Sequence, residues 1–470
     1  MVTVFLGNFM ASLDGTIVNV SLPTMLADLG GSLPTIAWVV IAYRLASAGS
    51  ILSFGRLSDL AGSRPIYAYG FLIFTVGSAL AGLFSRSAEE LIAYRVLQGL
   101  GGAMMLSNSF AIVTASFPSH ERGKVIGLIV TSWTLGSSLG PALGGFLVSL
   151  LGWRSIFTVN LPVGVVGFVM AQHFLPAGVR SGRRLDYVGA VTFALALTPL
   201  LVALREVGQG RLWAGGPLLV ASGGAFLFLY MYERRLQDPL LDLRLLGQRF
   251  VRVSVVARLG MVASLAVVDL MMPFYLVGVL GYSPLHLGFL LTSLPLSFAL
   301  AGALGGWASD RVGVLPPVLV GSALMAAAQL LLSVGVRGGE AVLTPLLGLV
   351  GFGVAGGLFF APNSSGILGV TPADRRGFAS SLLPMLWNVG YSLGSALASV
   401  VFTLSVPATS AGLGEVLKAG AASSGSLLAP GIQSTLVLGG VMALVALLVY
   451  AVRRRDAPKA DRGGTAGSAT

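Results

Sequence analysis

Two short stretches of sequence decide the fold. Residues 55–62 read Gly-Arg-Leu-Ser-Asp-Leu-Ala-Gly, and residues 306–313 read Gly-Trp-Ala-Ser-Asp-Arg-Val-Gly. Both follow the pattern Gly-x-x-Ser-Asp-x-x-Gly, and each joins two long apolar segments. A second echo links residues 118–123 (Pro-Ser-His-Glu-Arg-Gly) to residues 372–377 (Pro-Ala-Asp-Arg-Arg-Gly). The same connections recurring between apolar segments predict an internal structural repeat.

The composition indicates that lipid is the solvent for most of the surface. Of the 470 residues, 55% are hydrophobic and 10% are charged, whereas a soluble domain carries about 25% charged residues. So little polar surface cannot coat a protein of this size in water. The 64 glycines also fit closely packed membrane helices. We therefore predict an all-α polytopic membrane protein.

The apolar pattern predicts fourteen membrane-spanning helices. They lie at residues 3–26, 36–56, 65–85, 88–112, 124–148, 154–175, 187–205, 214–232, 252–280, 284–308, 314–335, 341–366, 377–405 and 430–452. Both echoes are eight spans apart, whereas two halves of six spans would place them six apart. Spans seven and eight are therefore predicted to be inserted between two six-helix repeats.

This interpretation divides the chain into four parts. We expect an N-terminal six-helix bundle at 1–175, a linker with two extra transmembrane helices at 176–251, a C-terminal six-helix bundle at 252–452 and a cytoplasmic tail at 453–470.

The orientation follows from the basic residues, which concentrate on the cytoplasmic side of membrane proteins. They cluster after spans six and eight and after the last span, at Arg180, Arg183, Arg184, Arg234, Arg235, Arg244, Arg249, Arg252, Arg453, Arg454 and Arg455. We therefore expect both termini in the cytoplasm and the protein in the cell (inner) membrane. The same bias accounts for most of the net charge of +11 without a nucleic-acid partner.

Several function classes are excluded or disfavoured by what the sequence lacks. It has no cysteine, which excludes disulfides, thiol nucleophiles and cysteine-bound metals. Its three histidines, His120, His173 and His286, are scattered, so we expect no metal site. No Gly-x-x-x-x-Gly-Lys-[Ser/Thr] phosphate-binding loop occurs. We expect neither an enzyme nor an ATP-driven pump, and we expect no cofactor.

Four ordered motifs resemble those of the major facilitator superfamily, specifically its fourteen-helix drug:proton antiporter branch. Besides residues 55–62, they are residues 13–23 (Leu-Asp-Gly-Thr-Ile-Val-Asn-Val-Ser-Leu-Pro), 95–103 (Arg-Val-Leu-Gln-Gly-Leu-Gly-Gly-Ala) and 136–145 (Gly-Ser-Ser-Leu-Gly-Pro-Ala-Leu-Gly-Gly). The segment Trp153–Gly164 is also typical of the branch. The chain departs from the pattern at Leu60 and Ser63, where basic residues are usual. The resemblance implies proton-coupled export.

Two acids lie deep within predicted spans. Asp14 is near the middle of span one, where a carboxylate is costly unless it is paired, hydrated or protonated. It is a candidate proton or substrate-cation site; the alternative is a hydrogen bond to a neighbouring helix. Asp269, in the outer half of span nine, is a second candidate, and its alternative is an ion pair with a facing arginine. The resemblance expects glutamine near Val277, where this chain is apolar.

Three arginines also fall within predicted spans, away from the span ends. Arg95 matches a motif arginine that the resemblance implies tunes the proton affinity of the span-one acid. Arg44 stands where leucine is more usual, and it either binds a substrate anion, modulates an acid or extends to the outer interface. Arg258 lies within two turns of the inner face, and we expect it to extend to that interface.

Apolar, aromatic and amide side chains are candidates for the substrate cavity. Soft side chains such as methionine suit varied apolar ligands. Besides the two acids, the candidates are Met271, Met272, Phe274, Tyr275, Met385, Trp387 and Asn388.

The glycine motifs are candidates for conformational control. Glycines at this spacing give span five a smooth face, and Pro141 interrupts its hydrogen bonds; the alternative is ordinary helix packing. In the repeated loops, Asp59 and Asp310 either brace a cytoplasmic gate or cap a loop. The candidates are Gly55, Asp59, Gly62, Arg64, Gly136, Gly140, Pro141, Gly144, Gly145, Gly306, Asp310 and Arg311.

We predict proton-coupled export of small hydrophobic or cationic compounds by a monomer that alternates access to a central site. The partners are the lipid bilayer, a small-molecule substrate and protons. Two alternatives share the fold: a proton-linked uptake symporter and an exporter of lipids or lipid-like molecules. A membrane enzyme, a sensor or a channel has less support from the residues.

Overall fold

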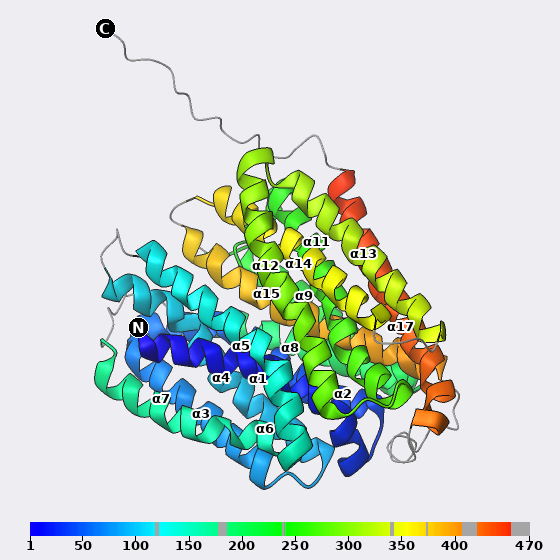
Figure 1. Ribbon diagram of the computed structural model, residues 1–470. Helices are drawn as coiled ribbons and strands as arrows, with labels where there is room; N and C mark the ends of the chain where they lie inside the picture. The colour runs from blue at the N-terminus through cyan, green and yellow to red at the C-terminus, as the bar shows by residue number, and fades with distance from the viewer. Residues whose placement is uncertain are drawn as a thin grey trace.

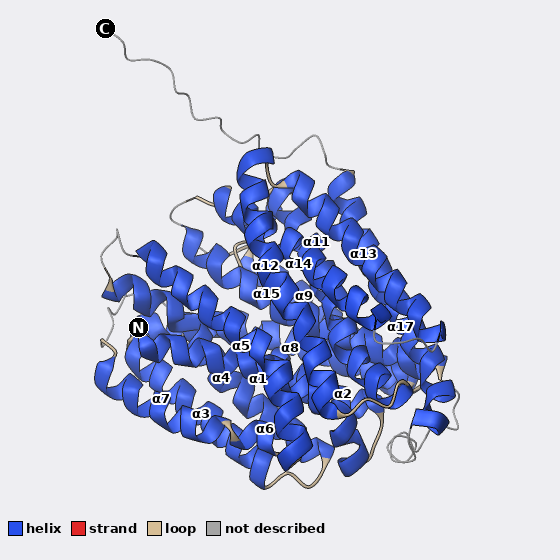
Figure 2. Ribbon diagram, in the orientation of Figure 1, coloured by secondary structure: helices blue, strands red, loops and turns tan. Residues whose placement is uncertain are grey.

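The chain folds as an assembly of long helices in the computed structural model, and the described residues contain no strand (Figure 2). The structure describes residues 1–117, 122–176, 186–236, 239, 241–338, 343–372, 375–406 and 421–452. The predicted tail 453–470, Arg180, Arg183, Arg184 and parts of the second sequence echo (118–121, 373–374) lie outside them. The side chain of Asp59 is also outside the described set.

The first half of the helices comes from residues 1–175, and we refer to it as the N half. Its members are α1 (Val2–Leu29), α2 (Leu33–Ala61), α3 (Ser63–Leu83), α4 (Ala88–Ser116), α5 (Arg122–Leu151), α6 (Ser155–Thr158) and α7 (Asn160–Phe174). Two further long helices follow, α8 (Tyr187–Gly208) and α9 (Leu212–Glu233), and then the short α10 (Leu243–Gly247).

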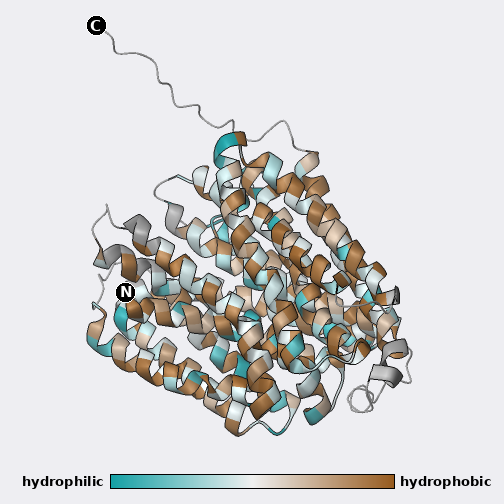
Figure 3. Cartoon of the chain, viewed as in Figure 1, coloured by the Kyte–Doolittle hydropathy of each residue, from teal (hydrophilic) through white to brown (hydrophobic). Residues whose placement is uncertain are grey.

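The remaining helices form the C half. They are α11 (Arg249–Phe274) with the π-helix η1 (Tyr275–Val279), α12 (Pro284–Val312), α13 (Leu315–Gly338), α14 (Leu343–Gly369), α15 (Arg376–Ser405) and α17 (Ala421–Ala451). Figure 1 shows the N half in blue to cyan beside the C half in green to red. Hydrophobic residues occupy most of the length of the helices (Figure 3).

The helices of the two halves pair in the same order. In the N half, α1 packs on α5, α4 packs on both α2 and α3, and α7 packs on α3. In the C half, α11 packs on α15, α14 packs on both α12 and α13, and α17 packs on α13. The halves meet where α5 contacts α12, α2 contacts α15 and α1 contacts α11. Helix α9 packs on α8, which lies against both α2 and α15.

Twelve helices among the described residues are long and apolar enough to cross a membrane. Helices α1 and α4, of 28 and 29 residues, coincide with two more predicted spans but are not among the twelve. Their hydropathy is lowered by polar residues such as Asp14 and Arg95, which other helices bury. The prediction of a helical membrane protein is confirmed. Twelve of the fourteen predicted spans are confirmed as candidate spans, and the total of fourteen is not confirmed.

The repeated Gly-x-x-Ser-Asp-x-x-Gly motif ends a helix in the same way in both halves. Gly62 follows α2 with φ 94°, and its N–H donates to the carbonyl of Ser58 at 2.9 Å. Gly313 follows α12 with φ 86°, and its N–H donates to the carbonyl of Ser309 at 3.0 Å. Only glycine adopts this backbone conformation at little cost. The last glycine of each motif therefore fixes a sharp turn into the next helix.

The glycines of α5 bring two other helices close. A methyl group at Gly136 would lie 2.5 Å from the carbonyl of Phe9 on α1, and one at Gly144 would lie 3.0 Å from that of Ile17. Gly140 lies against Thr16 of the same helix. Gly145 instead faces the C half, where a methyl group would collide with the carbonyl of Pro284 on α12.

The contact between Gly145 and Gly288 is the tightest approach of the two halves that we find among the described glycines. A methyl group at Gly145 would lie 3.0 Å from the Cα of Gly288, and one at Gly288 would collide with the carbonyl of Pro141. Backbone therefore packs directly on backbone where α5 ends and α12 begins.

We expect Gly145→Ala to separate α5 from α12, because the added methyl group meets backbone rather than a movable side chain. Overpacking of this kind costs about 1–3 kcal/mol. The chain has no cysteine, so a single cysteine placed at Leu287, which has no exposed surface, reports the opening. We expect maleimide to label it about tenfold faster in the Gly145→Ala background.

Gly224→Ala is the matched control, because a methyl group there meets no atom within 4 Å. It should leave the labelling rate unchanged. Equal labelling in both backgrounds would contradict the view that this contact holds the halves together.

Candidate functional site

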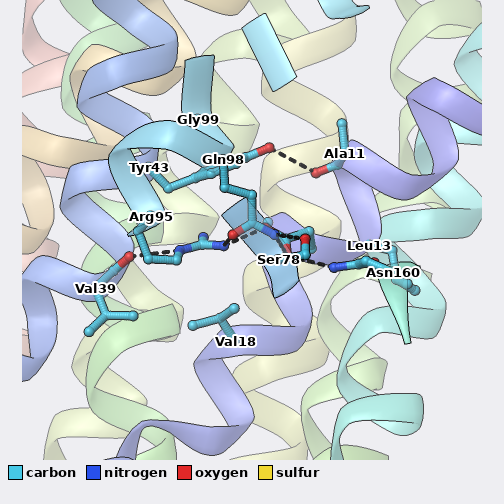
Figure 4. A network of polar contacts seen from close by, with 12 residues as sticks. Ala11, Leu13, Val18, Val39, Tyr43, Ser78, Arg95, Gln98, Gly99 and Asn160 are labelled. Carbon is cyan, nitrogen blue, oxygen red and sulfur yellow. Dashed lines mark hydrogen bonds and ion pairs between the residues drawn. The ribbon is translucent and has the colours of Figure 1, made fainter. Parts of the chain in front are cut away.

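Asp14 lies inside the N half and has no exposed surface. The Nη1 of Arg95 on α4 lies 2.5 Å from its Oδ2. Its Oδ1 accepts hydrogen bonds from Gln98 Nε2 at 2.8 Å and from Asn160 Nδ2 at 3.1 Å. Figure 4 shows Gln98 and Asn160 on opposite sides of the network of polar contacts. Three donors from two helices therefore surround this carboxylate.

Arg95 is enclosed as completely as the acid, with 1% of its surface exposed. Its Nε donates to the carbonyl of Val39 at 3.0 Å, and its guanidinium carbon lies 4.3 Å from the ring centre of Tyr43. Gln98 also donates to Ser78 Oγ at 2.8 Å. The network thus joins α1, α2, α3, α4 and α7.

This geometry supports the structural alternative for Asp14. We predicted that Asp14 lines the substrate cavity, but with no exposed surface it offers no atom to a substrate in this conformation. The physical reason is that a charged pair in an apolar bundle is stabilised by complete enclosure among donors and acceptors. Its predicted partnership with Arg95 is present in the geometry. Its role in proton coupling stays a prediction.

A second polar group lies where the two halves meet. Tyr391 on α15 donates from its hydroxyl to Asp269 Oδ2 on α11 at 3.1 Å. The same hydroxyl accepts a hydrogen bond from Asn19 Nδ2 on α1 at 3.1 Å. Asp269 is partly exposed. A chain of two hydrogen bonds therefore links this acid to the N half.

Arg44 on α2 joins the same group. Its Nη2 donates to the carbonyl of Gly15 at 3.0 Å, and its Nη1 donates to Asn388 Oδ1 at 3.4 Å. Its guanidinium carbon lies 4.6 Å from the ring centre of Tyr391. Arg44 therefore points into the junction of the halves, and the alternative of extension to the outer interface is wrong.

We define the interface cluster as Asn19, Arg44, Asp269, Asn388 and Tyr391. It holds one acidic residue, Asp269, and one basic residue, Arg44, both in contact with Tyr391. The predicted ion pair between Asp269 and a facing arginine is not among the ion pairs of the described residues. The two charges are instead joined through the tyrosine.

The other predicted cavity residues divide into two groups. Trp387 and Asn388 on α15 face the N half, since Trp387 packs on Trp133 of α5 at 5.7 Å between ring centres. Met272 and Tyr275 are 0% and 2% exposed inside the C half, so they present almost no surface to a ligand in this conformation, and their place in the cavity stays a prediction. The helix changes to a π-helix at Tyr275. Because a π-helix has a wider turn than an α-helix, Tyr275 does not keep the helix face that α-helical spacing from Asp269 predicts.

Met271 and Phe274 have no exposed surface, and Met385 is 5% exposed. These three apolar candidates therefore lie in the core and present little surface to a ligand.

The residues predicted to form the cytoplasmic gate lie at helix ends. Arg64 donates to the carbonyl of Gln172 at the end of α7. Asp310 and Arg311 are exposed, and Arg311 lies 4.2 Å from the ring centre of Trp307 on its own helix. Gly55 faces Ser107 of α4, whereas Gly306 faces open space. The described contacts therefore include no bridge between the two repeated loops.

Sequence reasoning missed several members of these groups. Asn19, Gln98 and Asn160 stand inside the motifs that carry the resemblance, so the motifs were an available signal. Tyr391 belongs to none of those motifs, and no pattern marked it. Arg258 was expected to extend to the inner interface, but it is 6% exposed and bonded to α14.

Comparison with known proteins establishes the class. The Major Facilitator Superfamily matches residues 4–245 and 254–469, and the chain belongs to this superfamily of transporters. It is 32% identical over 408 residues to the riboflavin transporter RibZ of Clostridioides difficile, covering 86% of this chain and 88% of that one. It is also 32% identical to the multidrug resistance protein Stp of Mycobacterium tuberculosis, covering 86% of this chain and 75% of Stp.

Solved structures share the fold. A POT family peptide transporter aligns with a TM-score of 0.65 at 16% identity, covering 99% of both chains. The xylose transporter XylE of E. coli aligns with a TM-score of 0.61 at 14% identity, covering 95% of both. At these identities the likeness extends to the fold alone.

We expect Asp14→Asn to destabilise the protein strongly, because it leaves Arg95 charged and buried without its partner. Breaking a buried ion pair in this way costs about 3–5 kcal/mol. Thermal unfolding in detergent micelles measures the effect. The control is Glu206→Gln, whose partner Arg211 is 57% exposed and whose loss should cost at most about 1 kcal/mol. Equal melting temperatures for the two variants would refute the prediction.

Proposed function

We propose that the chain exports small molecules in exchange for protons by alternating access. The observation that supports this most directly is the hydrogen-bond chain from Asp269 through Tyr391 to Asn19, because it crosses from the C half to the N half. Protonating an acid at such a junction changes the attraction between the halves. A carrier needs only that proton and substrate favour different states.

The proposed cycle uses the charge of the interface cluster. With Asp269 ionised, Arg44 and the Tyr391 hydroxyl favour the joined arrangement that the contacts describe. A proton on Asp269 removes the negative charge that attracts the positive charge of Arg44. The joined arrangement is then weaker, and the halves can separate on this side. Return of the proton to the cytoplasm restores the junction.

The proposed topology has two more membrane spans than the twelve apolar helices. We infer that α1 and α4 span the membrane with the twelve apolar helices, giving fourteen spans. We also infer that α8 and α9 are inserted between two six-helix repeats, because the helix pairings on either side of them are equivalent. Both termini then lie in the cytoplasm of a cell that carries the monomer in its inner membrane. The α5–α12 contact closes the outer side.

The energy source in this proposal is the proton gradient, without ATP and without a cofactor. The substrates are small hydrophobic or cationic compounds, a class supported by relatives named multidrug transporters, such as MdtP of Bacillus subtilis, which is 30% identical over 356 residues. A second candidate is an aromatic metabolite, because RibZ is named a riboflavin transporter. Uptake by symport and lipid export remain alternatives that the transport test separates.

We expect inverted membrane vesicles with an acidic lumen to accumulate a transported dye, since protons leave the lumen as the dye enters. Asp269→Asn should abolish this dependence on the gradient, reducing accumulation by about tenfold or more. Dye fluorescence inside the vesicles measures it. Glu89→Gln, which changes an exposed acid at the start of α4, should behave like the unmodified protein.

Two results would contradict the proposal. Gradient-driven accumulation by Asp269→Asn at the normal rate would remove Asp269 from the coupling mechanism. Proton-driven movement of dye out of the acidic lumen would indicate symport.

A further inference from the structure

Arg258 on α11 is a buried cation. It lies nine residues after Arg249, where the helix begins, or about 14 Å along the axis. It is 6% exposed. Its Nη1 donates to Asn363 Oδ1 at 3.1 Å and to Ser364 Oγ at 3.0 Å, both on α14. Its Nε is buried and has no hydrogen-bond partner among the described residues.

The groups around Arg258 are neutral. Asn363 donates to the hydroxyl of Tyr450 on α17 at 2.8 Å, and this hydroxyl donates to Ser254 Oγ at 2.8 Å. None of the ion pairs found among the described residues includes Arg258. A guanidinium stays protonated in proteins, so its charge persists inside the bundle. Buried charges are normally paired.

Arg258 differs in this respect from buried Arg95 and half-buried Arg44. Arg95 has Asp14 at 2.5 Å, and Arg44 shares Tyr391 with Asp269. Arg258 alone among them has no acid in its described surroundings. The described part of the chain therefore supplies no negative charge to Arg258.

Aromatic rings lie next to this cation at the junction of the halves. The guanidinium carbon is 5.2 Å from the ring centre of Phe360, which lies 5.1 Å from that of Trp387. Trp387 also contacts Phe298 at 6.3 Å and Trp133 of the N half at 5.7 Å. We call Trp133, Phe298, Phe360 and Trp387 the aromatic cluster. All but Phe360 are partly exposed.

We propose that, in a conformation in which the junction of the halves is open, Arg258 and the aromatic cluster bind the transported molecule, and that this molecule is an aromatic compound with a carboxylate, sulfonate or phosphate group. Its anionic oxygens pair with the guanidinium, for which a planar fork of donors is well suited. Its ring packs on the partly exposed rings of both halves. The inference rests on the proposed export function, and within it assigns this site to aromatic anions instead of the cationic compounds proposed above.

The test compares two dyes that share a xanthene ring system and differ in charge: fluorescein, an anion, and rhodamine 123, a cation. Binding to purified protein is measured by fluorescence polarisation, and export by accumulation in inverted vesicles. We expect Arg258→Gln to weaken fluorescein binding about tenfold or more, because a hydrogen-bonded charge is lost. Rhodamine 123 binding should not weaken.

Two further variants separate charge from structure. Arg258→Lys keeps the charge without the fork, so fluorescein binding should fall between those of the unmodified protein and Arg258→Gln. Trp387→Ala removes a ring surface and should weaken both dyes. Arg234→Gln, at an exposed arginine after α9, is the control and should change neither.

The results distinguish failure of this site from failure of the export function. Equal losses of both dyes in Arg258→Gln would assign Arg258 a structural role and overturn the proposal, as would unmodified protein that binds rhodamine 123 but not fluorescein. If either result is found and rhodamine 123 is still exported in a gradient-dependent way, the site is refuted and the proposed export function is supported. Arg258-dependent fluorescein binding without gradient-driven transport of either dye would support the site and refute proton-coupled export.

Discussion

The structure depends on the cost of placing a charge in an apolar interior. That cost is met most completely by the ion pair between Asp14 and Arg95, in which every oxygen of the acid has a donor. Because the donors and acceptors come from five helices, the pair fixes how those helices pack. Gln98, which stands inside a sequence motif, is one of these donors and contributes to the packing of the fold.

The charges of the interface cluster are stabilised in the apolar interior by a different arrangement. Asp269 and Arg44 lie on opposite halves and are joined through Tyr391, with no direct ion pair. A weaker link suits a junction that opens in the proposed cycle, whereas the enclosed pair of the N half suits a body that moves as a unit in that cycle. The position of a charge relative to the helix junctions therefore separates structural from movable polar groups.

Much of the fold was predictable from the sequence, because apolar length and the repeated glycine motif are local properties. The motif predicted a repeated connection, and Gly62 and Gly313 adopt nearly the same turn. The site was less predictable, because it depends on which helices meet. Asp14 and Met272 are buried, and Arg44 points into the junction of the halves, because of how distant helices pack. No single segment of sequence encodes that packing. Tyr391 has no local signature, although it joins the two membrane charges of the junction.

Helix α8 contacts α2 of one half and α15 of the other. Near its end, Arg205 donates to Thr35 at the start of α2 at 3.4 Å. If the halves move relative to one another as proposed, a helix held against both has to slide over at least one of them. The pair α8 and α9 then presents a changing outline to the surrounding lipid. The thickness and lateral pressure of the bilayer thereby become part of the energy balance of transport.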